Sequence, residues 1–239
     1  KLQQDVGVAT IEANEKDFRT RALARWQDNP AIEVLGNTAN DSLSIFSLRL
    51  KCETASGMRD LHYGFVVALL NDLFGIQARG GCSCAGPYGH DLLNMDMNAS
   101  RAIEKEIKKG YMVLRPGWVR LNFNYFIDES TFDYLLSAVE LIANHGSRLL
   151  PYYEFDSTSA TWRFQGREMQ LGLALSEFDF TSSTLGGGSG TDSEKDAVTP
   201  RPVFKPNRDL PAFLAQAKEE LARNTRGGTR YSVSLPASV

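Results

Sequence analysis

Long uninterrupted apolar segments are missing from this sequence of 239 residues. The longest, at residues 65–70, is followed at once by Asn71 and Asp72, whereas about 20 consecutive apolar residues are needed to cross a bilayer. Residues 1–5 also lack the apolar core of a secretory signal. We therefore expect a protein that neither spans a membrane nor binds one.

Cysteine and excess basic charge are both scarce. Three cysteines are too few, and odd in number, for the disulfide framework of a small secreted protein, which favours a reducing, cytoplasmic setting. Lysine and arginine together number 26 against 29 aspartates and glutamates, so the formal net charge is −3. Without a basic surface to displace counterions, we expect no binding to nucleic acid.

The residues that are present have the composition of a globular protein, with 42% hydrophobic and 23% charged residues. Apolar residues recur at helical spacing over residues 12–26, 61–74, 130–146 and 210–221, and a polar helix is expected at residues 100–109. Strand-like patterns lie at residues 32–36, 43–50, 76–79 and 119–124. This order predicts an α+β fold, with a small antiparallel or mixed sheet covered by helices.

Three segments of different composition divide the chain. Residues 1–165 carry the periodic patterns and are predicted to form one domain. Residues 166–207 contain a glycine- and serine-rich run and several prolines, which predicts a flexible, partly disordered linker. Residues 208–239 are expected to form a final amphipathic helix and a tail, with the helix packing on the preceding domain or on a partner.

Two helix ends can be assigned from capping residues. Gly75 follows the helix predicted at residues 61–74, where a left-handed C-terminal cap is expected. Ser130 and Asp133 fit an N-terminal capping pattern for the helix that ends near Gly146.

The segment least explained by packing is the loop RGGCSC at residues 79–84. Glycines permit unusual backbone angles, and a cation next to a thiol stabilises the thiolate, so Cys84 is a candidate nucleophile. The alternative is that both cysteines act as small apolar residues in a turn. Cys82, Cys84 and His90 also offer three metal ligands, but no second cluster lies close in sequence, and we expect no metal site.

The segment LLNDLFGIQARGGCSCAGPYGH (69–90), followed by GWVRLNFN (117–124), resembles the small C-terminal domain of class V aminotransferase-fold proteins. These are fold type I enzymes that depend on pyridoxal phosphate (PLP). The resemblance extends from the first predicted helix to about Gly146 and is sharpest over the glycine-cysteine loop. It implies the fold of that small domain for the ordered part of the chain.

The resemblance also implies roles for individual residues. In cysteine desulfurases and selenocysteine lyases the matching loop carries the cysteine that takes sulfur from the substrate, and Cys84 falls on that position. Arg120, on the strand before the last helix, matches the arginine that binds the substrate carboxylate, and a guanidinium suits that group. Arg79 at the loop entrance is expected to line the substrate site. The alternatives are a solvated strand-face cation for Arg120 and a structural ion pair for Arg79; His62 and His90 are expected to be structural.

The parts that would hold PLP are not recognisable in this chain. In the family, the lysine, the aspartate and the phosphate-binding loop lie on a large domain that precedes the small one. The resemblance thus implies the C-terminal half of a PLP-dependent, cysteine desulfurase- or lyase-like enzyme acting on a small amino acid. Its partner would be the upstream large domain, which would also form most of a homodimer interface. The alternative function is that of a catalytically inactive interaction module that keeps the fold.

Overall fold

The computed structural model describes residues 1–82, 86–157, 159–165 and 210–223. The helices are α1 (Leu2–Val6), α2 (Val8–Trp26), α3 (Tyr63–Phe74), α4 (Gly86–Leu92), α5 (Met97–Lys108), α6 (Glu129–His145) and α7 (Leu210–Arg223), with 3₁₀ turns η1 (Met112–Leu114) and η2 (Gly146–Tyr152). The strands are β1 (Ile32–Val34), β2 (Ile45–Thr54), β3 (Gly57–Asp60), β4 (Arg79–Gly81), β5 (Trp118–Asn122), β6 (Tyr153–Asp156) and β7 (Thr161–Phe164).

The strands form an antiparallel sheet in the order β1-β2-β5-β4, with β3 paired to β2. The predicted α+β class is therefore confirmed, and the first two strands, β1 and β2, pair antiparallel. β5 comes late in the chain but inserts between β2 and β4. A separate two-stranded sheet, β6-β7, follows α6.

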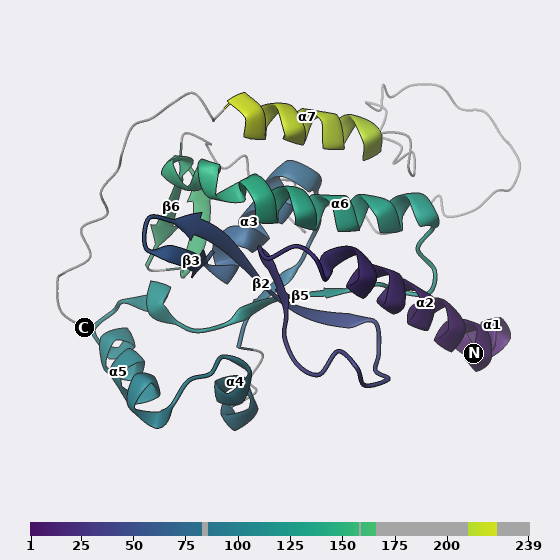
Figure 1. Cartoon of the computed structure of the whole chain (residues 1–239), viewed down its shortest axis with the longest axis horizontal. Coiled ribbons are helices and arrows are strands. Elements are labelled where there is room, and N and C mark those ends of the chain that lie inside the picture. The colour runs from purple at the N-terminus through teal and green to yellow at the C-terminus, as the bar shows by residue number, and fades with distance from the viewer. Residues whose placement is uncertain (83–85, 158, 166–209, 224–239) are drawn as a thin grey trace, which may run out of the picture.

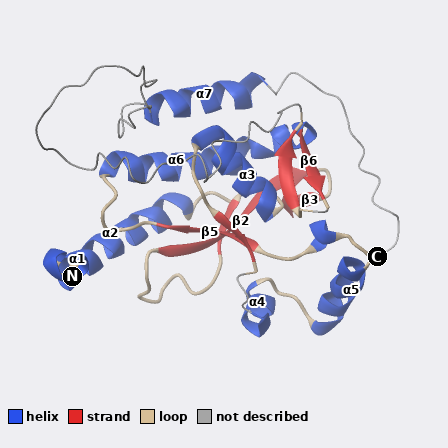
Figure 2. Ribbon diagram, turned by 180° about the vertical axis from the view of Figure 1, so that it is seen from behind, coloured by secondary structure: helices blue, strands red, loops and turns tan. Residues whose placement is uncertain are grey.

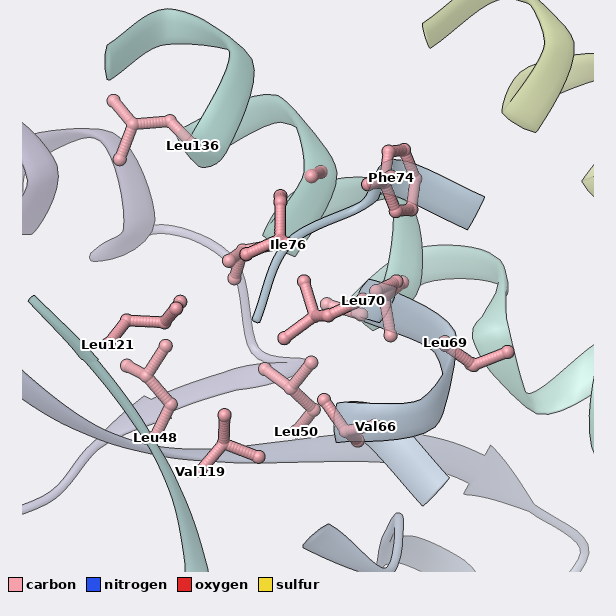
Figure 3. Packing of buried hydrophobic residues seen from close by; sticks show 14 of the residues in the cluster. Leu48, Leu50, Val66, Leu69, Leu70, Phe74, Ile76, Val119, Leu121 and Leu136 are labelled. Atoms are coloured by element: carbon pink, nitrogen blue, oxygen red, sulfur yellow. The ribbon is translucent and has the colours of Figure 1, made fainter. Parts of the chain in front are cut away.

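One face of the main sheet is buried under helices. Along β5, Val119 and Leu121 are buried whereas Arg120 and Asn122 are exposed, the period of two expected for a strand with one covered face. Figure 3 shows the buried side chains of β2 and β5 below those of α3, with Leu136 of α6 above. Burial of each of these large apolar side chains contributes about 1.5–3 kcal/mol.

The helices lie in layers. α2, α3 and α6 lie on one side of the main sheet, and α7 lies outside α6 (Figure 1). α4 and α5 lie on the opposite side in both views (Figures 1 and 2). The predicted last helix thus exists as α7 and packs on the preceding domain through Ala217 and Leu221, which are buried. Among the described residues, no helix is long and apolar enough to cross a bilayer.

Helix ends differ in part from the predictions. Gly75 is the left-handed cap of α3, with φ 64° and ψ 19°, as predicted. The strand predicted from Ile76 begins only at Arg79, because the Ile76 N–H donates to the Leu70 carbonyl and closes the end of α3. The cap of α6 is Asp128 and not Ser130, since the Asp128 carboxylate accepts from the Thr131 N–H at 2.7 Å.

Two hairpins were not predicted. The first joins β2 to β3, whose four residues are all exposed. The second, β6-β7, lies in the segment after Pro151, where helical or strand periodicity fades. Trp162 of β7 packs on Phe65 of α3, so the second hairpin is part of the domain. The predicted linker at residues 166–207 lies outside the described residues, as do the residues beyond 223 of the predicted tail.

Candidate functional site

The face of the sheet that points away from α3 and α6 is only partly covered, and we call it the open face; it is formed by Ile45, Ser47, Arg79, Arg120 and Asn122. In the β4-β5 ladder, Arg79 is the direct partner of Arg120. Directly opposed residues of an antiparallel pair project from the same face, with Cβ atoms about 4.5–5.5 Å apart. The fold therefore brings the two predicted substrate-binding arginines together as one arginine pair.

The arginine pair has no acidic partner among the described residues, and both side chains are exposed. The acids on this side of the sheet are used elsewhere. Glu33 Oε2 forms ion pairs with Arg49 at 3.3 Å and with Lys51 at 3.0 Å, and Asp60 is paired with Arg49. The charge of the β1-β2-β3 side is therefore balanced, whereas the β4-β5 side carries two uncompensated cations.

The entrance of the glycine-cysteine loop is held by Tyr63, at the start of α3. A Cβ on Gly80 would lie 2.7 Å from Tyr63 Cδ2, and one on Gly117 would lie 2.6 Å from the Gly81 carbonyl carbon. Gly81 has a φ of 126°, an angle that L side chains rarely adopt. Three glycines are therefore required where β4 leaves β5, and they fix the direction in which the loop departs.

Tyr63 also marks a charged group that the sequence did not reveal. Burial raises the pKa of the Tyr63 phenol, whereas the nearby Arg115 guanidinium acts to lower the same pKa. Cys82 is exposed and close enough to Tyr63 to affect the phenol as well. Arg115, from the segment before β5, thus lies near the start of the cysteine loop. The two segments come close only in the folded chain.

The proposed nucleophile lies outside the described residues, which exclude 83–85. Within the described part of the chain, no group of three or more His, Cys, Asp or Glu side chains is arranged to hold a metal ion.

The two histidines near the loop are both engaged in structural contacts. His62 Nδ1 accepts hydrogen bonds from the Gly64 N–H at 3.0 Å and from Trp162 Nε1 at 2.9 Å. His90 of α4 is within hydrogen-bonding distance of Ser100 Oγ in α5, at 3.2 Å. The first contact joins the β6-β7 hairpin to α3, and the second joins the two helices on the other side of the sheet.

Comparison with known proteins does not identify a family for this chain. No known family and no curated protein matches the chain. The resemblance to class V aminotransferase-fold proteins therefore stays a prediction from the residues that carry it.

Four of the seven lysines that the structure describes are engaged in ion pairs. An imine with PLP requires an amine free to lose its proton. Four lysines are held in ion pairs with carboxylates, at nitrogen to oxygen distances of 2.6–3.1 Å: Lys16 with Asp41, Lys51 with Glu33, Lys108 with Glu104 and Lys109 with Glu106. The residues that would hold PLP therefore stay a prediction for the upstream domain.

Proposed function

We propose that this chain is the carboxylate-binding, C-terminal half of an amino-acid enzyme that resembles the PLP-dependent cysteine desulfurases and selenocysteine lyases. The observation that carries the proposal is the arginine pair: Arg79 and Arg120 are direct ladder partners on the open face and have no acidic partner among the described residues. Like charges directly opposed across two strands destabilise a sheet. Such an arrangement is favourable once an anion binds between them.

The chemistry of the two side chains fits a substrate carboxylate. A guanidinium presents a planar fork of N–H donors that binds a carboxylate through two parallel hydrogen bonds. Arg120 would bind the carboxylate of a small amino acid, and Arg79, next to the glycines of the loop, would line the same site. Cys84, which follows Arg79 by five positions, would accept the sulfur of the substrate.

An upstream large domain would supply PLP and cover the open face. Exposed apolar side chains at the end of the sheet where β2 begins and β5 ends support this arrangement: Leu43 is 67% exposed, Ile45 46% and Phe126 71%. Ile45 is the ladder partner of Asn122, two positions from Arg120, so Ile45 borders the arginine pair on the open face. Apolar surface next to a charged site is typical of a domain interface that carries an active site.

The proposal is tested by supplying the upstream half. The chain is joined or co-expressed with the PLP-binding large domain of its parent, and sulfide release from cysteine is measured at several substrate concentrations. Arg120→Gln is expected to raise KM at least tenfold. Cys84→Ala is expected to abolish persulfide formation while the PLP absorbance is retained. Unchanged KM in the first variant would remove Arg120 from the site, and persulfide formation in the second would remove Cys84.

A second candidate function is an interaction module without catalysis, which the same exposed apolar residues favour. Under that alternative, Leu43 and Phe126 contribute to partner binding, whereas the arginine pair contributes little. Phe126→Ser would then weaken the complex with the upstream half. The double variant Arg79→Gln/Arg120→Gln would change neither the affinity of this complex nor the rate of sulfide release.

A further inference from the structure

We infer that the arginine pair binds a small molecule with two anionic groups, such as a dicarboxylate, with one acid group on each guanidinium. The inference goes beyond the proposed function, in which the substrate is a small amino acid such as cysteine, and does not depend on it. Binding of the dianion itself is a property of the described residues.

The count of charges and donors favours a dianion. Arg79 and Arg120 each carry a full positive charge and five N–H donors in a fixed fork. One carboxylate fills the fork of one guanidinium through two hydrogen bonds. A monoanion would thus leave the second cation with neither a counter-charge nor bonded acceptors, whereas two acid groups on a short chain satisfy both forks.

The neighbouring residues leave this charge uncompensated. Arg120 has a second ladder partner, Ser47 of β2, which is uncharged. Next along the same strand is Arg49, but its charge is balanced by Glu33 and Asp60. The ladder partner of Arg79 on its one paired side is Arg120 itself, since β4 has no further strand beyond it in the described sheet.

The polar groups next to the arginine pair can form hydrogen bonds with such a ligand, and they add no charge to the site. Ser47 supplies a hydroxyl on one side of Arg120, and Asn122 supplies an amide two positions along β5 on the same face. Both groups donate hydrogen bonds but carry no charge. The two guanidinium groups therefore bind the anionic groups of the ligand. Ser47 and Asn122 can form neutral hydrogen bonds beside them.

The test uses the chain alone, without PLP or an upstream domain. Succinate and acetate are titrated into the protein at matched, low ionic strength, with binding followed by NMR of the arginine side-chain N–H groups. Succinate is expected to bind at least tenfold more tightly than acetate. Arg79→Gln and Arg120→Gln are each expected to reduce succinate binding to the level of acetate.

Arg59→Gln serves as the matched control, because Arg59 is an exposed arginine on β3, away from the β4-β5 ladder, and the variant loses the same charge. It is expected to leave the preference for succinate intact. Equal binding of succinate and acetate, or an equal loss in Arg59→Gln and Arg79→Gln, would overturn the inference.

A stability measurement keeps the test independent of any folding defect in the variants. Relief of the like-charge contact is expected to keep Arg79→Gln and Arg120→Gln at least as stable as the wild type without ligand. Succinate is expected to raise the thermal midpoint of the wild type and of Arg59→Gln, but not of these two variants. A midpoint rise of equal size in both variants would also overturn the inference. Because no turnover is measured, succinate binding can succeed or fail separately from the proposed enzymatic function.

Discussion

At the scale of single residues, Tyr63 organises the entrance of the cysteine loop. Its ring fills the space that Cβ atoms on Gly80 and Gly117 would occupy, so both glycines are required by the same side chain. At Gly117 the backbone of Gly81 is closer still, at 2.6 Å and 2.7 Å. The two glycines therefore differ in what an added methyl group meets: mainly side chains at Gly80, and rigid backbone at Gly117.

This difference leads to a prediction. Gly80→Ala and Gly117→Ala are each expected to lower the free energy of unfolding by about 1–3 kcal/mol, the usual cost of overpacking. In a Tyr63→Ala background the cost of Gly80→Ala is expected to fall, because the ring is gone, while the cost of Gly117→Ala persists. Urea unfolding of the single and double variants measures both costs. Equal relief at the two glycines would contradict the backbone contact at Gly117.

His62 makes stability depend on pH. Nδ1 of His62 accepts from two N–H donors and must be unprotonated to do so, and burial lowers the pKa of this histidine below its ordinary value of 6.5. The unfolded chain therefore binds a proton at His62 at a higher pH than the folded chain does. Stability from this group is complete above about pH 6.5 and decreases as the pH falls towards the lower folded-state pKa.

The expected result is a lower urea midpoint at pH 5.5 than at pH 7.5 in the wild type, with a smaller difference in His62→Asn. Burial also lowers the pKa of His145, which adds a decrease of the same sign. His145→Asn is therefore the matched comparison, and each variant is expected to remove part of the slope. A slope in His62→Asn as steep as that of the wild type would show that the contact with Trp162 does not govern the titration.

At the scale of elements, α7 stabilises the domain from outside its helical layer. Leu221 is 1% exposed and packs with α6 and α3, whereas Phe213 on the same helix is 46% exposed. Leu221→Ala is expected to lower the free energy of unfolding by about 2–5 kcal/mol, the range for a buried leucine that leaves a cavity. Phe213→Ala is expected to cost much less. Equal costs, measured by urea unfolding, would show that α7 is not docked as described.

At the scale of the whole molecule, the two sides of the main sheet differ in what they contribute. The helical side contains the apolar core, and the open face carries the arginine pair together with exposed Ile45. Four of the seven described lysines form ion pairs with carboxylates. Under the proposed function, the lysine that binds PLP comes from the upstream domain.

This division predicts the outcome of direct labelling. Incubation of the purified chain with PLP, followed by borohydride reduction and intact mass measurement, is expected to show no single stoichiometric lysine adduct. Scattered, substoichiometric labelling of surface lysines is compatible with this expectation. One fully labelled lysine would mean that the chain holds the cofactor itself, and peptide mapping would identify the residue.

The sequence by itself determined the features that depend on local periodicity. The helices α2, α3, α6 and α7, the alternation of β5 and the glycine cap of α3 all follow from residues adjacent in the chain, whose spacing fixes which face is apolar. The cap of α6 was misplaced by two positions because several polar residues in a row can each accept the first N–H groups.

Only the tertiary structure decided which distant residues meet. That Arg79 lies opposite Arg120 depends on the register of β4 against β5, and a shift of one residue would send one of the two side chains to the other face. The contact of Trp162 with His62 and the proximity of Arg115 to Tyr63 likewise depend on docking between separate elements. Local patterns carry no information on such pairings, because their energy comes from contacts made only after the chain has folded.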